Sequence, residues 1–167
     1  MEPLMDSGRI LVGDHDGVYV IKFVGDVRVT LCATMDAFLR GLLEREDFRS
    51  VIVDLQETSG IDSTSLGLLA KLSLETQRRF GVVPTLVSTN PDITRVLTAM
   101  GFGDVFHILE SPLTETGQLG ELPRIESDEE AMRQRVIDAH RTLMQLNESN
   151  RNCFRDLVLA LEGGAAA

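Results

Sequence analysis

Short apolar runs alternate with longer stretches of helical periodicity over the first two thirds of the chain. The runs are VIVDL, VVPTLV and VFHIL, at residues 51–55, 82–87 and 105–109. Such composition is typical of strands that helices cover. The segments before and between them carry apolar residues at three- and four-residue spacing and are long enough to be crossover helices. These segments are 34–46, 63–80 and 90–101. The alternation predicts an α/β fold in which the three runs are interior strands.

The N-terminal part of the chain has the pattern of a β-hairpin. Two apolar runs, residues 9–13 and 18–25, flank the sequence DHDG. Asp16-Gly17 is typical of a tight turn between antiparallel strands, because glycine readily adopts the positive φ that such turns need. We therefore predict the order ββαβαβ followed by one more αβ step. This order gives a mixed sheet, with an N-terminal antiparallel hairpin and then parallel strands joined by crossover helices.

The pattern stops after residue 110. Residues 111–124 contain two prolines and two glycines, which is typical of a linker, and a helical stretch follows from 125 to 162. We therefore predict a domain at 1–110, a linker at 111–124 and a C-terminal helical extension at 125–167.

Charge and composition indicate which partners and which location in the cell to expect. The formal net charge of −10 is opposite to that of nucleic-acid-binding proteins, so a basic protein surface is the expected partner. The opening sequence has acidic residues and no long apolar run, so we expect neither a signal peptide nor a membrane span, and a cytoplasmic protein. Cys32 and Cys153 stand far apart without a metal-binding pattern, and we expect two free thiols that serve as packing residues.

Residues that could carry catalysis are dispersed. His15, His107 and His140 stand at no metal-ligand spacing with one another or with cysteine, and the sequence has no phosphate-binding loop or serine-nucleophile motif. Asp54 and Asp62 are expected to lie close together where strands end, which is the edge at which open α/β sheets bind ligands. We predict a recognition module rather than an enzyme, without a metal or a cofactor.

The sequence GIDSTSLGLLAKL, residues 60–72, places four potential capping residues in a row. Asp62, Ser63, Thr64 and Ser65 could each accept a hydrogen bond from a free backbone N–H at the start of the helix at 63–80. One cap needs only one residue. The alternatives are that Ser63 is merely the cap, or that its hydroxyl has a separate role.

Residues 9–110 resemble a STAS domain of the anti-sigma factor antagonist type. The family pattern is a strand ending in Asp-Leu, a short loop, and Asp-Ser-Ser/Thr-Gly-Leu-Gly at the start of a helix. Here it reads Asp54-Leu55 and then DSTSLG at residues 62–67. An early Gly-Glu-Leu-Asp element reads GDVR at residues 25–28, and RVLTAMGFGDVFHIL at 95–109 matches the late segment loosely.

The resemblance implies a phosphorylation switch. In that family the serine of the helix-opening motif is phosphorylated by a partner kinase and dephosphorylated by a PP2C-type phosphatase, and only the unmodified form binds its target. Carried over by position, the switch residue is Ser63, with Thr64 or Ser65 as the fallback. Two residues depart from the family pattern, because Ser65 replaces a glycine and Arg28 replaces an aspartate. The implied partner-binding residues are Gly25, Asp26, Arg28, Asp54, Asp62, Thr64, Ser65 and Leu66.

Three alternative functions are consistent with the sequence. The first is a phosphorylation-switched module that binds an anti-sigma factor or a similar signalling protein. The second is a structural STAS subunit attached to the ATPase of a transporter. The third is a small-ligand or nucleotide-binding sensor.

The stretch 125–162 is not covered by the resemblance. We predict one long helix that begins with a capping box at Ser127–Glu130 and ends near Gly163-Gly164. Its apolar stripe either packs on the protein's own domain or forms an intermolecular seam, as in a homodimer or a second partner site. The stripe consists of Met132, Val136, Ala139, Leu143, Leu146, Asn150, Cys153, Leu157 and Ala160.

Overall fold

A computed structural model describes residues 8–113 and 117–164. The first seven residues of the predicted domain, part of the predicted linker and the last three residues of the predicted extension lie outside this range. Within the described residues, six strands form one sheet in the order β5-β4-β3-β2-β1-β6. The strands are β1 (Arg9–His15), β2 (Val18–Val27), β3 (Ser50–Ile61), β4 (Thr85–Val87), β5 (His107–Leu109) and β6 (Gly120–Glu121).

The mixed sheet predicted from the sequence is confirmed. Strands β1 and β2 are antiparallel, and β2, β3, β4 and β5 are mutually parallel. The turn between β1 and β2 has positive φ at both Asp16 (50°) and Gly17 (85°), as expected for a two-residue hairpin loop. One expectation was wrong, because β5 is an edge strand rather than an interior one and His107 on it is exposed.

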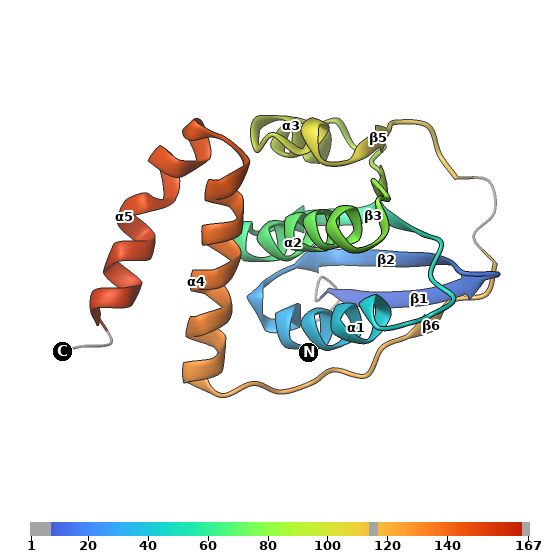
Figure 1. The fold of residues 1–167 in the computed structure, drawn as a ribbon, viewed down its shortest axis with the longest axis horizontal. Helices are drawn as coiled ribbons and strands as arrows, with labels where there is room; N and C mark the ends of the chain where they lie inside the picture. Colours follow the sequence, from blue (N-terminus) through green and yellow to red (C-terminus); the bar gives the residue numbers. More distant parts are fainter. Residues whose placement is uncertain (1–7, 114–116, 165–167) are drawn as a thin grey trace, which may run out of the picture.

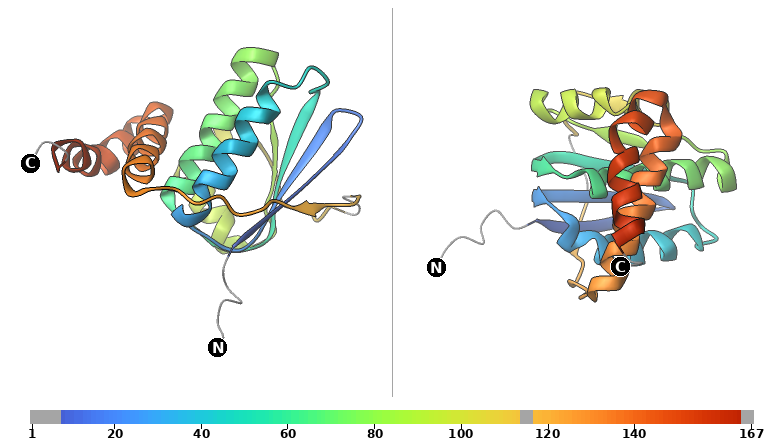
Figure 2. Two further views of the ribbon diagram at one scale, coloured as in Figure 1. Left: turned by 90° about the horizontal axis from the view of Figure 1, so that it is seen from below. Right: turned by 90° about the vertical axis from the view of Figure 1, so that its left-hand side faces the viewer.

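The helices of the α/β part are α1 (Cys32–Leu43), α2 (Ser63–Phe80) and α3 (Pro91–Ala99), with 3-10 turns η2 (Val29–Leu31) and η3 (Phe102–Asp104). Figure 1 and Figure 2 show α1 and α2 side by side on one face of the sheet. Between this face and the helices lies the core, which includes Ile21, Phe23, Val53 and Leu69. The last residue of β3 is one position before the N-cap of α2, so the sheet fixes where α2 begins.

The C-terminal extension is a pair of helices. Helix α4 (Glu129–Leu146) and helix α5 (Glu148–Gly164) are separated at Asn147, whose backbone is extended. The prediction of one long helix was therefore wrong. The Asn147 side chain accepts a hydrogen bond from the backbone N–H of Asn150 at 2.7 Å, so it caps α5. The predicted capping box was also wrong, because the N-cap of α4 is Asp128, which accepts from the N–H of Ala131 at 2.7 Å.

The break changes which residues of the predicted stripe are buried. Ala139, Leu143 and Asn150 are buried, but Cys153, Leu157 and Ala160 on α5 are exposed. Phe154 and Val158 are instead the buried side chains of α5. The expectation that Cys153 is a packing residue was wrong, whereas Cys32 is buried. Helix α4 packs on α2 and crosses the N-terminal ends of α1 and α2 (Figure 1).

None of the helices in the part of the chain that the structure describes is long and apolar enough to span a membrane.

Candidate functional site

Asp62 is the residue that caps α2. Its Oδ1 accepts a hydrogen bond from the backbone N–H of Ser65 at 2.9 Å, and its Oδ2 accepts one from the N–H of Val29 at 2.7 Å. The backbone N–H of Asp62 in turn donates to the carbonyl of Val27 at 3.0 Å. One carboxylate thus fixes the start of α2 to the end of β2. Because Asp62 caps α2, the Ser63 hydroxyl is not used as a cap.

Ser63 is the first residue of α2 and is half-buried. Its Oγ lies 2.7 Å from Nε2 of His140, a residue of α4 that is 77 positions away in the sequence. Ser63 is therefore not fully exposed at the helix terminus, because α4 covers part of it. Its position at the N-terminus of the helix agrees with the prediction.

The three residues after Ser63 point into the molecule. Thr64, Ser65 and Leu66 are 6%, 0% and 1% exposed. The Ser65 hydroxyl lies 3.7 Å from the Sγ of Cys32 in the interior. Burial raises the pKa of the Cys32 thiol to about 11, although the hydrogen bond with Ser65 lowers it. In this conformation none of the three side chains can contact a partner, and Ser63 is the one hydroxyl residue of the motif that is not fully buried.

Gly25, Asp26 and Arg28 lie beside the start of α2. The sheet register pairs Asp26 with Gly60 and Val27 with Ile61, so the ends of β2 and β3 meet at one edge. Arg28 is exposed, and its Nε donates to Oδ2 of Asp26 at 2.8 Å. This hydrogen bond raises the pKa of the Arg28 guanidinium. The structure thus brings the GDVR element and Asp62 together.

Asp54 lies elsewhere. It is in the middle of β3, fully buried, between Lys22 on β2 and Val87 on β4 in register. Its Oδ1 accepts from the backbone N–H and the side chain of Gln56, at 2.9 and 3.0 Å. Eight residues of strand at about 3.3 Å each separate it from Asp62 by roughly 25 Å. The expectation that the two carboxylates lie close together was therefore wrong, and a buried Asp54 cannot contact a partner directly.

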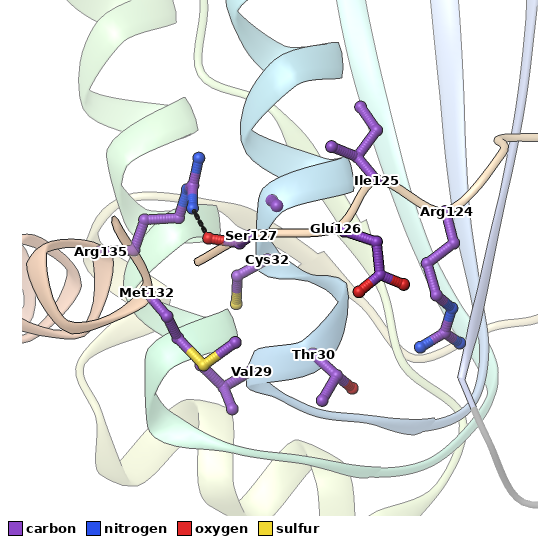
Figure 3. Close-up of a pocket in the computed structure, with 10 residues that line it drawn as sticks. Val29, Thr30, Cys32, Arg124, Ile125, Glu126, Ser127, Met132 and Arg135 are labelled. Carbon is purple, nitrogen blue, oxygen red and sulfur yellow. Dashed lines mark hydrogen bonds between the residues drawn. The ribbon is translucent and has the colours of Figure 1, made fainter. Parts of the chain in front are cut away.

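A pocket of about 160 Å³ lies next to the site, where the start of α1 meets residues 124–127 and the first turns of α4 (Figure 3). Arg135 extends from α4 across this region and donates to Ser127 Oγ at 2.9 Å and to Asp36 Oδ2 on α1 at 3.2 Å. Small-molecule sites are usually about 300 Å³ or larger. The geometry is that of a joint between α1 and α4. Among the described residues, no group of His, Cys, Asp and Glu side chains could hold a metal ion.

Comparison with known proteins identifies the fold family. The model of the STAS domain matches residues 9–114, which is more than half of the chain. The chain belongs to the STAS domain family. No curated protein sequence is significantly similar to it.

Two solved structures have the same fold as this STAS protein. One is an anti-sigma factor antagonist from Mycobacterium paratuberculosis, with a TM-score of 0.56 and 21% identity over 64% of this chain and 89% of the other. The second is the Bacillus cell fate determinant SpoIIAA in the phosphorylated form, with a TM-score of 0.51 and 17% identity over 60% of this chain and 90% of the other. Helices α4 and α5 lie beyond the region that matches the STAS model.

His140 is the site residue that the sequence did not reveal. Its ring is 2% exposed, its Nδ1 lies 2.7 Å from the carbonyl oxygen of Val136, and Phe154 of α5 packs edge-on against it with ring centroids 4.9 Å apart. In the sequence it is one of three dispersed histidines, and it lies on the amphipathic stretch at 125–162. No local pattern connects it with Ser63. Only the docking of α4 on the STAS domain brings the two together.

Proposed function

We propose that this STAS protein is a phosphorylation-switched anti-sigma factor antagonist. Its unmodified form binds an anti-sigma factor or a related signalling protein, and phosphorylation of Ser63 releases that target. A serine kinase and a PP2C-type phosphatase are the expected modifying enzymes. The binding surface is the edge formed by Gly25, Asp26, Arg28 and Asp62, which lies next to Ser63.

The observation that carries the proposal is that Asp62, and not Ser63, caps α2. Asp62 caps α2 through Oδ1 and accepts from the N–H of Val29 through Oδ2, and Ser63 retains a hydroxyl that capping does not require. Thr64 and Ser65, the fallback residues, are buried, which favours Ser63 as the modified position. The fold is shared with an anti-sigma factor antagonist and with SpoIIAA in its phosphorylated form, which supports the proposed class of function.

Phosphorylation would act at the interface rather than on the fold of the STAS domain. A phosphate at a helix N-terminus meets the positive end of the helix dipole and free N–H groups, so it stabilises α2 locally. It also adds about −1.5 to −2 charge and bulk to the surface that must fit the target. A hundredfold loss of affinity corresponds to about 2.7 kcal/mol, which one desolvated, unpaired charge can supply.

Variants at position 63 test the switch. Ser63→Ala should bind the target constitutively and should not be labelled by the kinase, whereas Ser63→Asp should bind more weakly, though less so than phosphoserine, since a carboxylate carries less charge. Ser59→Ala is the matched control, because Ser59 is an exposed serine on β3 four positions earlier. Affinity can be measured by titration calorimetry, and the modified residue by mass spectrometry. Equal affinity of the unmodified protein, Ser63→Asp and phosphoserine-63 protein would disprove the switch.

Co-purification of tagged protein from its native host identifies the class of target. We expect a protein kinase or an anti-sigma factor whose recovery is lost when Ser63 is phosphorylated. Recovery of a transporter ATPase independent of position 63 would support the structural-subunit alternative, and a small molecule that shifts the melting temperature would support the sensor.

A further inference from the structure

The helix pair α4–α5, termed here the hairpin, is attached to the STAS domain by polar contacts at three points, two on α4 and one at the start of α5. Near the start of α4, Arg135 pairs with Asp36 of α1 at 3.2 Å. In its middle, His140 meets Ser63 of α2. Beyond its end, Asn150 donates to the carbonyl of Met100, after α3, at 2.9 Å. Figure 2 shows the hairpin as a separate layer beside α1 and α2. The middle attachment uses the atom that the proposed switch would modify.

The direction of the Ser63–His140 hydrogen bond follows from the partner on the other ring nitrogen. The Val136 carbonyl can only accept, so Nδ1 of His140 carries the proton. In the neutral imidazole Nε2 is then an acceptor, and the Ser63 hydroxyl donates to it. A phosphate ester at Ser63 has lost that hydrogen and places acceptor oxygens against an acceptor nitrogen. The contact that joins α4 to the switch is therefore specific for unmodified serine.

Two contacts hold the imidazole in place, and rotating it aside to admit a phosphate would break both. One edge of the ring is held by the Val136 carbonyl, and Phe154 of α5 packs against it. At 2.7 Å, the gap between Ser63 Oγ and Nε2 holds no further atoms. The ring must therefore leave together with the helix that carries it, and close-packed interfaces of this kind separate in discrete steps rather than by small deformations.

Helix α4 lies against α2 at backbone contact. A Cβ added at Gly67 would be 2.3 Å from the carbonyl oxygen of Ala139 and 2.6 Å from its Cβ. Ala139 precedes His140, so this contact sets the height at which the imidazole reaches Ser63. The glycine in the motif thus permits docking of α4 to the depth that covers Ser63.

We propose that the hairpin is a lid over Ser63 that the unmodified protein holds closed, and that a phosphate on Ser63 displaces. The lid is built so that it can leave as a unit, because α4 and α5 pack on each other and the connection at residues 122–128 has no regular structure. Kinase and lid compete for the same hydroxyl. By linkage, any protein that binds the released hairpin favours phosphorylation to the extent that phosphorylation favours its binding. The inference rests on Ser63 as the proposed phosphorylation site.

The first test opens the lid without adding charge. Gly67→Ala places a Cβ against the Ala139 backbone, while alanine is the better residue within α2 itself. Hydrogen exchange of the full-length protein should become about tenfold faster or more in α4, with exchange in β2 and β3 unchanged. Gly41→Ala is the matched control, because Gly41 is in α1 with open space around it and should change nothing. Unchanged exchange in α4 of Gly67→Ala would overturn the lid.

The second test uses the modification itself. Phosphoserine incorporated at position 63 during synthesis should give the same increase in exchange of α4 as Gly67→Ala, again by about tenfold or more. Unchanged exchange would show that the phosphate is accommodated under a closed lid, and slower exchange would show that His140 binds the phosphate as an imidazolium. Either result overturns the proposal. Because this measurement uses neither kinase nor target, it can fail while the proposed function holds, and the target-affinity measurements can fail while the lid holds.

Discussion

The STAS domain and the hairpin differ in how they are held together. The largest fully buried side chains of the described residues, such as Phe23, Leu69 and Phe102, come from the STAS domain, whereas α4 contributes Leu143 and α5 contributes none. The hairpin is held by fewer buried apolar side chains, among them Leu143 and Phe154, and by polar groups at its three attachment points. Regions with little buried apolar surface open at lower free energy than the core. We conclude that the hairpin is the part of the molecule suited to move.

Core truncation should give the largest difference between the two regions. Leu69 is fully buried in α2, and Leu69→Ala removes packing that the sheet and helices cannot refill. We expect a loss of about 2–5 kcal/mol in the free energy of unfolding. The matched control is Leu159→Ala on α5, where 59% of the residue is already exposed, and it should cost less than about 0.5 kcal/mol. Urea denaturation measures both, and equal costs would show that the hairpin belongs to the core.

The STAS domain could be predicted from the sequence because its determinants are local. The alternation of apolar runs and helical stretches gave the order of strands and helices, and Asp16-Gly17 gave the first turn. The edge position of β5 could not be read, because an apolar run of this length does not reveal how many neighbours a strand has. The end of β3 was also misplaced. The apolar run stops at Asp54-Leu55, but the strand continues through Ile61.

The hairpin and its contact with Ser63 could be predicted only in part. The spacing of apolar residues correctly indicated helix, but it continues through Asn147, so the break is invisible to periodicity. An asparagine three positions before another asparagine is a weak capping signal beside a long apolar stripe. The Ser63–His140 pair joins residues 77 positions apart and depends on the depth at which α4 docks. Tertiary packing, which a local pattern does not encode, decides that depth.

One cysteine lies in each region, Cys32 in the STAS domain and Cys153 in the hairpin, and only Cys32 is buried. Cys32 is buried below Ser65 and Cys153 is exposed on α5. Because the pKa of Cys32 is raised to about 11 in the folded protein from 9.0, the folded state keeps this proton where the unfolded chain loses it. Below pH 9 the thiol is protonated in both states and has no effect. Between pH 9 and 11 the free energy of unfolding should fall by as much as about 2–3 kcal/mol.

A comparison of Cys32→Ala with Cys153→Ala isolates this effect. The pKa of Tyr19 is also raised by burial, and its contribution stays in both variants. The fall in stability between pH 9 and 11 should be smaller in Cys32→Ala and unchanged in Cys153→Ala, as measured by urea denaturation at each pH. The same slope in both variants would show that the Cys32 thiol does not distinguish the folded from the unfolded state.

The smallest expected effect concerns the junction of the hairpin. Asn147 caps α5 through its side-chain oxygen, and its amide also lies 3.4 Å from the carbonyl of Met100. Asn147→Ala leaves the first N–H groups of α5 without this acceptor and should cost about 1 kcal/mol, which corresponds to about fivefold faster hydrogen exchange in the first turns of α5. Asn152→Ala is the control, because Asn152 is an exposed asparagine within α5. If both variants exchange alike, the cap does not hold α5. If Asn147→Ala also accelerates exchange in α4 as strongly as in α5, the two helices open together, which is the behaviour expected of a lid that moves as one unit.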